Sequence, residues 1–146
     1  FAVGATGLIH FPCSGGNYGS VLQYDGASWR TWIRSQDALI PAMSGVWGSS
    51  PTNVFAVGGQ GTILRFNGRG WVRQASGTTA SLCAVWGSNA SDVYAVGGTT
   101  VVRFDGSVWS PVDTGTSESF RAIWGTPDGE VFLAGSSIVH GTPVSP

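Results

Sequence analysis

The sequence predicts an all-β protein of the β-propeller type, and two observations lead to this expectation. First, similar segments of about 39 residues recur along the 146-residue chain, so that Trp47, Trp86 and Trp124 stand 39 and 38 residues apart. Second, 23 glycines and seven tryptophans accompany only 10% charged residues, a composition typical of short strands joined by tight turns. No run of 18 apolar residues occurs in the sequence, so a transmembrane helix is not expected.

Each repeat is expected to form four antiparallel strands, and the third unit shows them best. The pattern predicts strands over residues 83–86, 93–96, 100–104 and 108–112, separated by short loops rich in Gly, Asn and Asp. One such sheet has two apolar faces and is not stable alone. Stacking several sheets around an axis buries both faces. A β-solenoid has shorter units of about 20–29 residues, so the unit length favours the propeller.

The predicted strands make about 3.5 blades. We expect a partial first blade over residues 1–37 with an insertion at residues 5–18, complete blades over 42–76 and 81–115, and a partial last blade over 119–146. A closed propeller has roughly four to eight blades. The open apolar faces therefore predict either a piece of a longer propeller or a ring that is completed by association of copies.

The repeats resemble two families of propeller repeat. The motif VYAVGG…VVRFDGSVW at residues 93–109 is similar to kelch repeats in its double glycine, its aromatic third strand and the Trp of its fourth. The motif DGxxW, at residues 25–29 and again at 105–109, resembles the Asp-box hairpin of sialidase-like repeats. In the second unit Asn67 replaces the Asp of this motif. The resemblance implies the fold and is nearly silent on activity.

Aromatic residues are the first candidates for ligand binding. Trp47, Trp86 and Trp124 each precede a glycine at the start of a unit, where they would either pack between blades or offer a platform to a sugar ring. Trp32 occurs outside the repeat pattern, so a role in contacting a partner is more open there. The insertion contributes Asn17 and Tyr18, which we expect on the loop face that propellers commonly use for binding.

Two further groups of residues raise hypotheses about structure and binding. Cys13 in the insertion and Cys83 at the start of the third unit would form a disulfide if their Cα atoms came within about 7 Å. A polar residue also recurs in the third strand of each unit. We expect a solvated or partly buried polar row, with carboxylate binding by its arginines as the alternative; its members are Gln23, Arg65, Arg103 and His140.

Charge and motif content argue against several functions. The net charge is −1 with seven Arg and no Lys, which does not predict nucleic-acid binding. Two cysteines are too few for a structural zinc site, and no DxDxDG motif suggests a calcium site. No GxSxG motif or Cys–His spacing indicates a nucleophile. We therefore expect no catalytic residues, no metal and no cofactor.

The sequence is best interpreted as a non-catalytic binding or scaffold module that contacts a protein partner or associates with itself through open blade faces. Its low charge and its Gly/Ser/Thr-rich loops favour an extracellular, cell-surface or periplasmic setting. One alternative is a lectin-type propeller that binds glycans on repeated aromatic residues. A second alternative, which follows from the Asp-box resemblance, is a fragment of a sialidase-like hydrolase.

Overall fold

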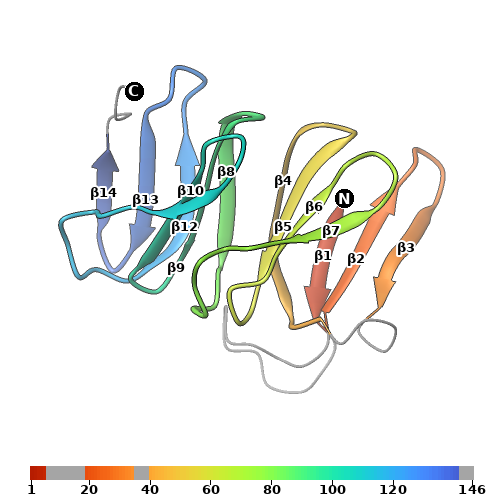
Figure 1. Ribbon diagram of the computed structural model, residues 1–146, viewed down its shortest axis with the longest axis horizontal. Helices are drawn as coiled ribbons and strands as arrows, with labels where there is room; N and C mark the ends of the chain where they lie inside the picture. Colours follow the sequence, from red (N-terminus) through yellow and green to blue (C-terminus); the bar gives the residue numbers. More distant parts are fainter. Residues whose placement is uncertain (6–18, 35–39, 142–146) are drawn as a thin grey trace.

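The computed structural model describes residues 1–5, 19–34 and 40–141, and every structural statement below refers to these ranges. They form fourteen strands in four antiparallel sheets (Figure 1). The strands of the first two sheets are β1 (Ala2–Ala5), β2 (Gly19–Tyr24) and β3 (Trp29–Arg34), then β4 (Met43–Ser50), β5 (Asn53–Gly58), β6 (Ile63–Phe66) and β7 (Trp71–Gln74). The strands of the last two are β8 (Ala84–Asn89), β9 (Asp92–Gly97), β10 (Thr100–Phe104) and β11 (Trp109–Pro111), then β12 (Phe120–Gly125), β13 (Val131–Gly135) and β14 (Ile138–Gly141).

Each sheet pairs its strands in sequence order, as a blade of a propeller does. The described sheets have three, four, four and three strands, which agrees with the expected total of about 3.5 blades. The sheets stand side by side in Figure 1, and the first strands of neighbouring blades contact one another, β4 with β8 and β8 with β12. The all-β propeller architecture predicted from the sequence is therefore confirmed. We number the blades 1 to 4 in chain order.

The strands of blade 3 differ from expectation mainly at their ends. The strand expected over residues 100–104 is β10, with the same bounds. The first strand, expected to end at Trp86, continues to Asn89 because the ladder with β9 resumes after an irregularity that follows Gly87. The last strand starts later than expected, at Trp109, because Val108 still belongs to the preceding turn, where its carbonyl accepts a hydrogen bond from the backbone N–H of Asp105 at 3.2 Å.

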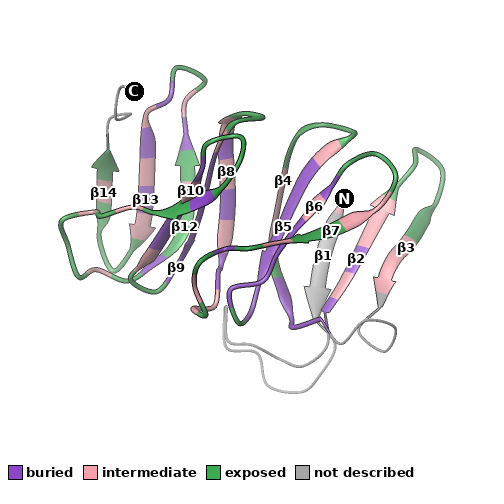
Figure 2. Ribbon diagram, in the orientation of Figure 1, coloured by how far each residue is buried: buried purple, intermediate pink, exposed green. Residues whose placement is uncertain are grey.

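The apolar core lies between blades rather than within them. Phe55 and Ile63 of blade 2 pack with Val93 and Phe104 of blade 3 in one fully buried cluster. Equivalent clusters join blade 1 to blade 2 and blade 3 to blade 4. Burying one large apolar side chain contributes about 1.5–3 kcal/mol, so each blade is held by its neighbours. Figure 2 shows β5 and β9 as mostly buried and β14 as mostly exposed. Among the described residues, no helix has the length and apolar character to span a bilayer.

Candidate functional site

A three-ring aromatic cluster recurs at two blade boundaries, between blades 1 and 2 and between blades 2 and 3. One ring comes from the earlier blade, and the third and fourth strands of the next blade supply a pair. Between blades 1 and 2, the ring centroid of Phe1 lies 5.2 Å from those of both Phe66 and Trp71. The same arrangement recurs between blades 2 and 3, with Phe55, Phe104 and Trp109. These rings explain much of the aromatic repetition in the sequence as packing.

The tryptophans of the first strands pack against glycines of the following blade. A Cβ atom on Gly87 would lie 2.7 Å from Cη2 of Trp47, and one on Gly125 would lie 2.5 Å from Cη2 of Trp86. Trp124 of blade 4 is 61% exposed. Ligand binding by these three residues stays a prediction, and Trp124 is the one whose ring is available to a ligand.

Trp32 is held by neighbours on two blades. Its Nε1 donates to Oε1 of Gln23 at 2.7 Å, its ring lies 5.1 Å from that of Phe66, and the guanidinium of Arg30 lies 4.6 Å from its centroid. These contacts give Trp32 a packing role between blades 1 and 2. A role in contacting a partner stays a prediction.

The candidate residues of the insertion, Asn17, Tyr18 and Cys13, lie outside the described residues. Cys83 is 8% exposed, and its backbone N–H donates to the carbonyl of Val96 at 2.6 Å. The disulfide between Cys13 and Cys83 therefore stays a prediction.

The two arginines of the polar row are hydrogen-bonded to the residues that begin the second strands of their own blades. Nε of Arg103 donates to Oδ1 of Asp92 at 2.7 Å, and this hydrogen bond raises the pKa of the Arg103 guanidinium. In blade 2 the acceptor is Asn53, whose Oδ1 accepts a hydrogen bond from Nε of Arg65 at 2.8 Å. Each pair is internal to one blade, so these arginines are primarily structural.

The same row also stacks on the aromatic residues of the second strands. The guanidinium carbon of Arg65 lies 5.3 Å from the ring centroid of Phe55. In blade 4, His140 stacks on Phe132 with centroids 4.6 Å apart and planes 13° apart, and its Nε2 is 3.7 Å from Oε1 of Glu130. The polar row thus covers the rings that point toward the next blade.

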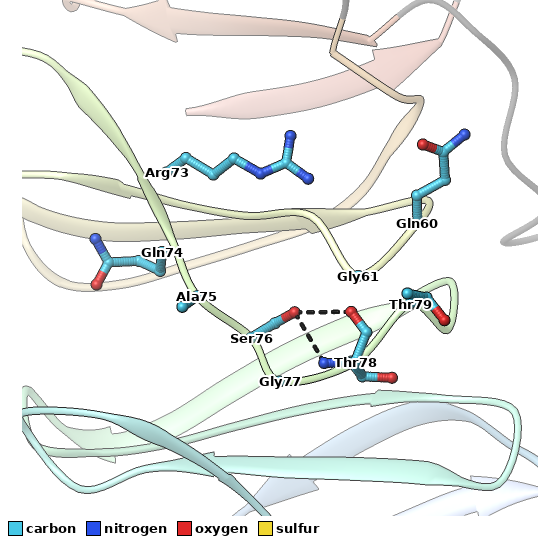
Figure 3. Close-up of a pocket in the computed structure, with 9 residues that line it drawn as sticks. All are labelled: Gln60, Gly61, Arg73, Gln74, Ala75, Ser76, Gly77, Thr78 and Thr79. Carbon is cyan, nitrogen blue, oxygen red and sulfur yellow. Dashed lines mark hydrogen bonds between the residues drawn. The ribbon is translucent and has the colours of Figure 1, made fainter.

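A polar hollow of about 620 Å³ lies between the β5–β6 turn and the segment that follows β7 (Figure 3). Hydroxyl, amide and backbone groups line it together with one guanidinium. The lining residues are Gln60, Gly61, Arg73, Gln74, Ala75, Ser76, Gly77, Thr78 and Thr79. None of these nine side chains carries a negative charge, so the hollow presents one cation among neutral polar groups.

A backbone hydrogen bond joins the two sides of this hollow: the N–H of Gly61 donates to the carbonyl of Ala80 at 2.8 Å. Within the segment that follows β7, Oγ of Ser76 donates to the carbonyl of Thr78 at 3.1 Å. Gln60 has a φ of 55°, an uncommon conformation for a residue other than glycine. Strained backbone of this kind clusters at ligand sites, which marks this rim as a candidate site.

Arg73 is the residue of the hollow that departs from the repeat. It pairs with Leu64 across the sheet, and the corresponding partners in blade 3 are Pro111 and Val102. Arg73 is exposed, and its Nη2 lies 3.4 Å from Oγ1 of Thr62. The sequence did not point to this site, because the pattern that predicts the fold consists of the residues that the repeats share. Arg73 stands where blade 3 has Pro111, so comparing the repeats for differences would have singled it out.

No candidate metal site emerges from the described ranges. They contain no group of three or more His, Cys, Asp or Glu side chains that could hold a metal ion. Asp25 and Asp105 instead cap turns, and hydrogen bonds from the backbone N–H groups of Ser28 and Val108 respectively are the main cause that lowers their pKa values. These carboxylates stabilise hairpins.

Comparisons with known proteins establish the fold alone. No family model matches the sequence, and no curated protein matches it. Among solved structures, the chain is similar to one described as "YCF48 bound to D1 peptide", with a TM-score of 0.59 and 14% sequence identity. The match covers 82% of this chain and 41% of that one, so this chain spans less than half of that propeller's length.

Proposed function

We propose that this chain is a non-catalytic, protein-binding propeller module that takes an acidic, extended segment of a partner in the polar hollow. The observation that carries the proposal is the exposed guanidinium of Arg73 in a hollow whose other lining groups are neutral. A guanidinium and a carboxylate form a bidentate, charge-assisted pair. The likeness in fold to a propeller solved with a bound peptide supports a protein segment as the ligand.

The composition of the hollow favours a peptide over a small apolar molecule. Pockets for small molecules are mostly apolar and enclose their ligands, whereas this hollow is lined by the amides of Gln60 and Gln74 and by hydroxyls such as that of Thr79. Amides and hydroxyls both donate and accept hydrogen bonds. They can therefore pair with the backbone of an extended peptide while Arg73 pairs with an acidic side chain.

Two capped hexapeptides, one of glutamate and one of glutamine, test this proposal by isothermal titration calorimetry. We expect binding of the glutamate peptide to weaken by about tenfold or more in the R73Q variant, since charge-assisted hydrogen bonds are worth about 1.5–3 kcal/mol and 1.4 kcal/mol is about tenfold in affinity. R69Q is the matched control, because Arg69 lies in the turn between β6 and β7, outside the hollow. Equal binding of both peptides, or equal loss in R73Q and R69Q, contradicts the proposal.

Glycan binding is the second candidate function, and the exposed ring of Trp124 favours it. A sugar stacks on an exposed aromatic face, and Trp124 is 61% exposed whereas Trp47 and Trp86 pack against glycines. Binding to a glycan array that disappears in W124A but persists in R73Q would favour the lectin. The opposite pattern with the glutamate peptide would favour the protein-binding module.

We further propose that the module acts outside the cytoplasm. The low charged fraction of 10% supports this location. Cell fractionation of the source organism tests it, and recovery of the protein with cytoplasmic markers would contradict it.

A further inference from the structure

We propose that a second polar hollow, formed around Arg65 on blade 2, binds a carboxylate that supplies the negative charge this arginine lacks in its own blade. Carboxylate binding was an alternative for the polar row as a whole, and here it is assigned to one member of that row. The site is separate from the hollow at Arg73 and does not depend on it.

The Arg65 hollow has a volume of about 400 Å³. One guanidinium, three side-chain amides, one hydroxyl and one apolar side chain line it. These six residues are Thr52, Asn53, Arg65, Asn67, Val72 and Gln74. Blade 2 has all four of its strands, and its first strand contacts strands of blades 1 and 3. Since none of the six side chains is acidic, the hollow carries one unpaired positive charge.

Arg65 and Arg73 lie on opposite faces of blade 2. Arg65 pairs across the sheet with Val72, whereas Arg73 pairs with Leu64. Successive side chains of a strand point to opposite faces, so Arg65 and Val72 share one face and Arg73 projects from the other. Figure 3 shows Arg73 and Gln74 pointing away from each other on β7. Gln74 lines both hollows, but each hollow has its own cation.

Blade 3 shows which groups the Arg65 hollow lacks. Its equivalent arginine, Arg103, has a raised pKa, mainly through the hydrogen bond to Asp92 and in smaller part through the negative charge of Asp105. The residues at these two positions in blade 2 are Asn53 and Asn67. One Arg and two Asp give a net charge of −1 in blade 3, whereas one Arg and two Asn give +1 in blade 2.

The guanidinium of Arg65 is held in place by neutral groups. Its Nε donates to Oδ1 of Asn53 at 2.8 Å, and its central carbon lies 5.3 Å from the ring centroids of both Phe55 and Phe104. Within residues 1–5, 19–34 and 40–141 it forms no ion pair, and both Nη groups remain as donors. A guanidinium that is already ordered in this way can bind a carboxylate through two parallel hydrogen bonds.

The amides of the hollow favour a singly charged carboxylate. Oδ1 of Asn67 accepts the N–H groups of Arg69 and Gly70, so its Nδ2 is left to donate, and the amide of Gln74 can donate as well. One guanidinium neutralises one carboxylate, whereas a phosphate dianion would keep a second, uncompensated charge. The carboxylate belongs either to a free small molecule or to an acidic side chain of a protein partner.

Titration with sodium acetate, followed through the NMR signal of the Arg65 Nε–H group, tests the site. We expect a saturable shift that equal concentrations of sodium chloride do not produce, while the Arg103 signal stays in place. R65Q assigns the signal. N53D gives blade 2 the acid of blade 3 and should weaken acetate binding by at least about tenfold, because an internal charge-assisted bond then competes with the ligand.

Two further variants keep this test independent of the behaviour of N53D. N67D adds the other acid of blade 3 and should also weaken acetate binding. R69Q is the matched control, because Arg69 lines neither hollow, and we expect unchanged binding. An unmoved Arg103 signal establishes in each variant that blade 3 is folded. An acetate shift that survives both N53D and N67D, or one no larger than the shift with chloride, overturns the proposal.

The reverse substitutions in blade 3 should create a site. The double variant D92N/D105N gives Arg103 the neutral surroundings of Arg65, so we expect acetate to shift the Arg103 signal as well. No new shift there would show that the missing acids do not make the site, and would overturn the proposal. So would equal shifts of both arginines in the unchanged chain.

The capped hexapeptide of glutamate separates the two sources of the carboxylate. A shift of the Arg65 signal with the peptide that N53D abolishes supports an acidic side chain of a protein partner. A response to acetate without a response to the peptide supports a free small-molecule carboxylate. None of these variants changes Arg73, and R73Q leaves Arg65 in place, so the two hollows succeed or fail independently.

Discussion

Trp86 of β8 lies directly against Gly125 of β12 in the next blade, so that a Cβ on that glycine would stand 2.5 Å from Cη2 of the indole. Trp47 and Gly87 repeat this relationship one blade earlier, at 2.7 Å. The tryptophan of one blade and the glycine at the end of the Trp-Gly pair in the next blade therefore have linked roles at these two boundaries. The indole fills the space that the absent side chain of the next blade's glycine leaves open.

The first prediction is that G87A destabilises the protein. The added methyl would meet the Trp47 ring and the backbone carbonyl of Asp92 at 2.8 Å, and overpacking of this kind costs about 1–3 kcal/mol. Urea unfolding measures the loss. G70A is the control, because a Cβ on Gly70 has no heavy atom within 4 Å, and we expect a change within about 0.5 kcal/mol.

The partner of the glycine can be tested in the same experiment. If the indole causes most of the cost, G87A should be markedly less damaging in a W47L background, because neighbouring substitutions are not additive. An equal cost in both backgrounds would assign the effect to the backbone contact with Asp92 instead.

The second prediction concerns the ion pair of blade 3. Asp92 accepts hydrogen bonds from Nε of Arg103 at 2.7 Å and from Oγ of Ser88 at 2.6 Å. Blade 2 maintains the same network with the neutral Asn53. We therefore expect D92N to lose only about 1 kcal/mol or less and D92A to lose about 1–3 kcal/mol, because alanine leaves partly buried donors unpaired.

Urea unfolding at low and high salt distinguishes the two contributions. The small loss in D92N should shrink further in 1 M NaCl, since it is a loss of charge. The loss in D92A should persist, since it is a loss of acceptors. Equal losses in the two variants would contradict this division.

The fold was predictable because packing is what the units share. The spacing of the tryptophans and the turn at Asp105 carry the repeat. Trp47 and Trp86 pack against glycines of the next blade, and Asp105 holds its hairpin turn. Whether a repeated ring is covered depends on the neighbouring blade, so the sequence alone did not distinguish the partly buried Trp86 from the exposed Trp124.

The candidate site was harder to predict because it combines separate turns. The hollow brings Gln60 of one turn beside Arg73 and Ser76 of a later segment, and no short motif contains all three. Trp32 shows the opposite case. It stands outside the repeat and suggested an open surface, yet its bond to Gln23 and its contact with Phe66 place it between blades.

The third prediction concerns the indole N–H of Trp109. The ring is 7% exposed, and its Nε1 is buried with no hydrogen-bond partner in the described part of the chain. W109F removes no hydrogen bond and retains an aromatic ring against Phe55 and Phe104, so we expect less than half the cost of W109A. Truncation of a buried Trp to Ala costs about 3–5 kcal/mol. Thermal unfolding of both variants tests this, and equal losses would indicate that Nε1 does have a partner.

The fourth prediction is that the turn carboxylates make stability fall in acid. Oδ1 of Asp105 accepts the backbone N–H groups of Val108 at 2.9 Å and Ser107 at 2.8 Å, and these bonds lower its pKa below the ordinary value of 3.8. Because the folded pKa is the lower one, the carboxylate contributes its full stabilisation above pH 3.8 and loses it as the pH falls through the folded value. Carboxyl NMR titration should place the pKa of Asp105 below 3.8.

The chain contains its own control for this effect. In blade 2, Oδ1 of Asn67 accepts the N–H groups of Arg69 and Gly70 at 2.9 and 3.0 Å in the same turn, and an amide does not titrate. D105N should therefore retain the turn and flatten the acid limb of the stability profile, which urea midpoints between pH 7 and pH 2.5 would reveal. An acid limb as steep in D105N as in the unchanged chain would show that Asp105 contributes none of it, and would shift attention to Asp25, whose carboxylate accepts the N–H groups of Ala27 and Ser28 in blade 1.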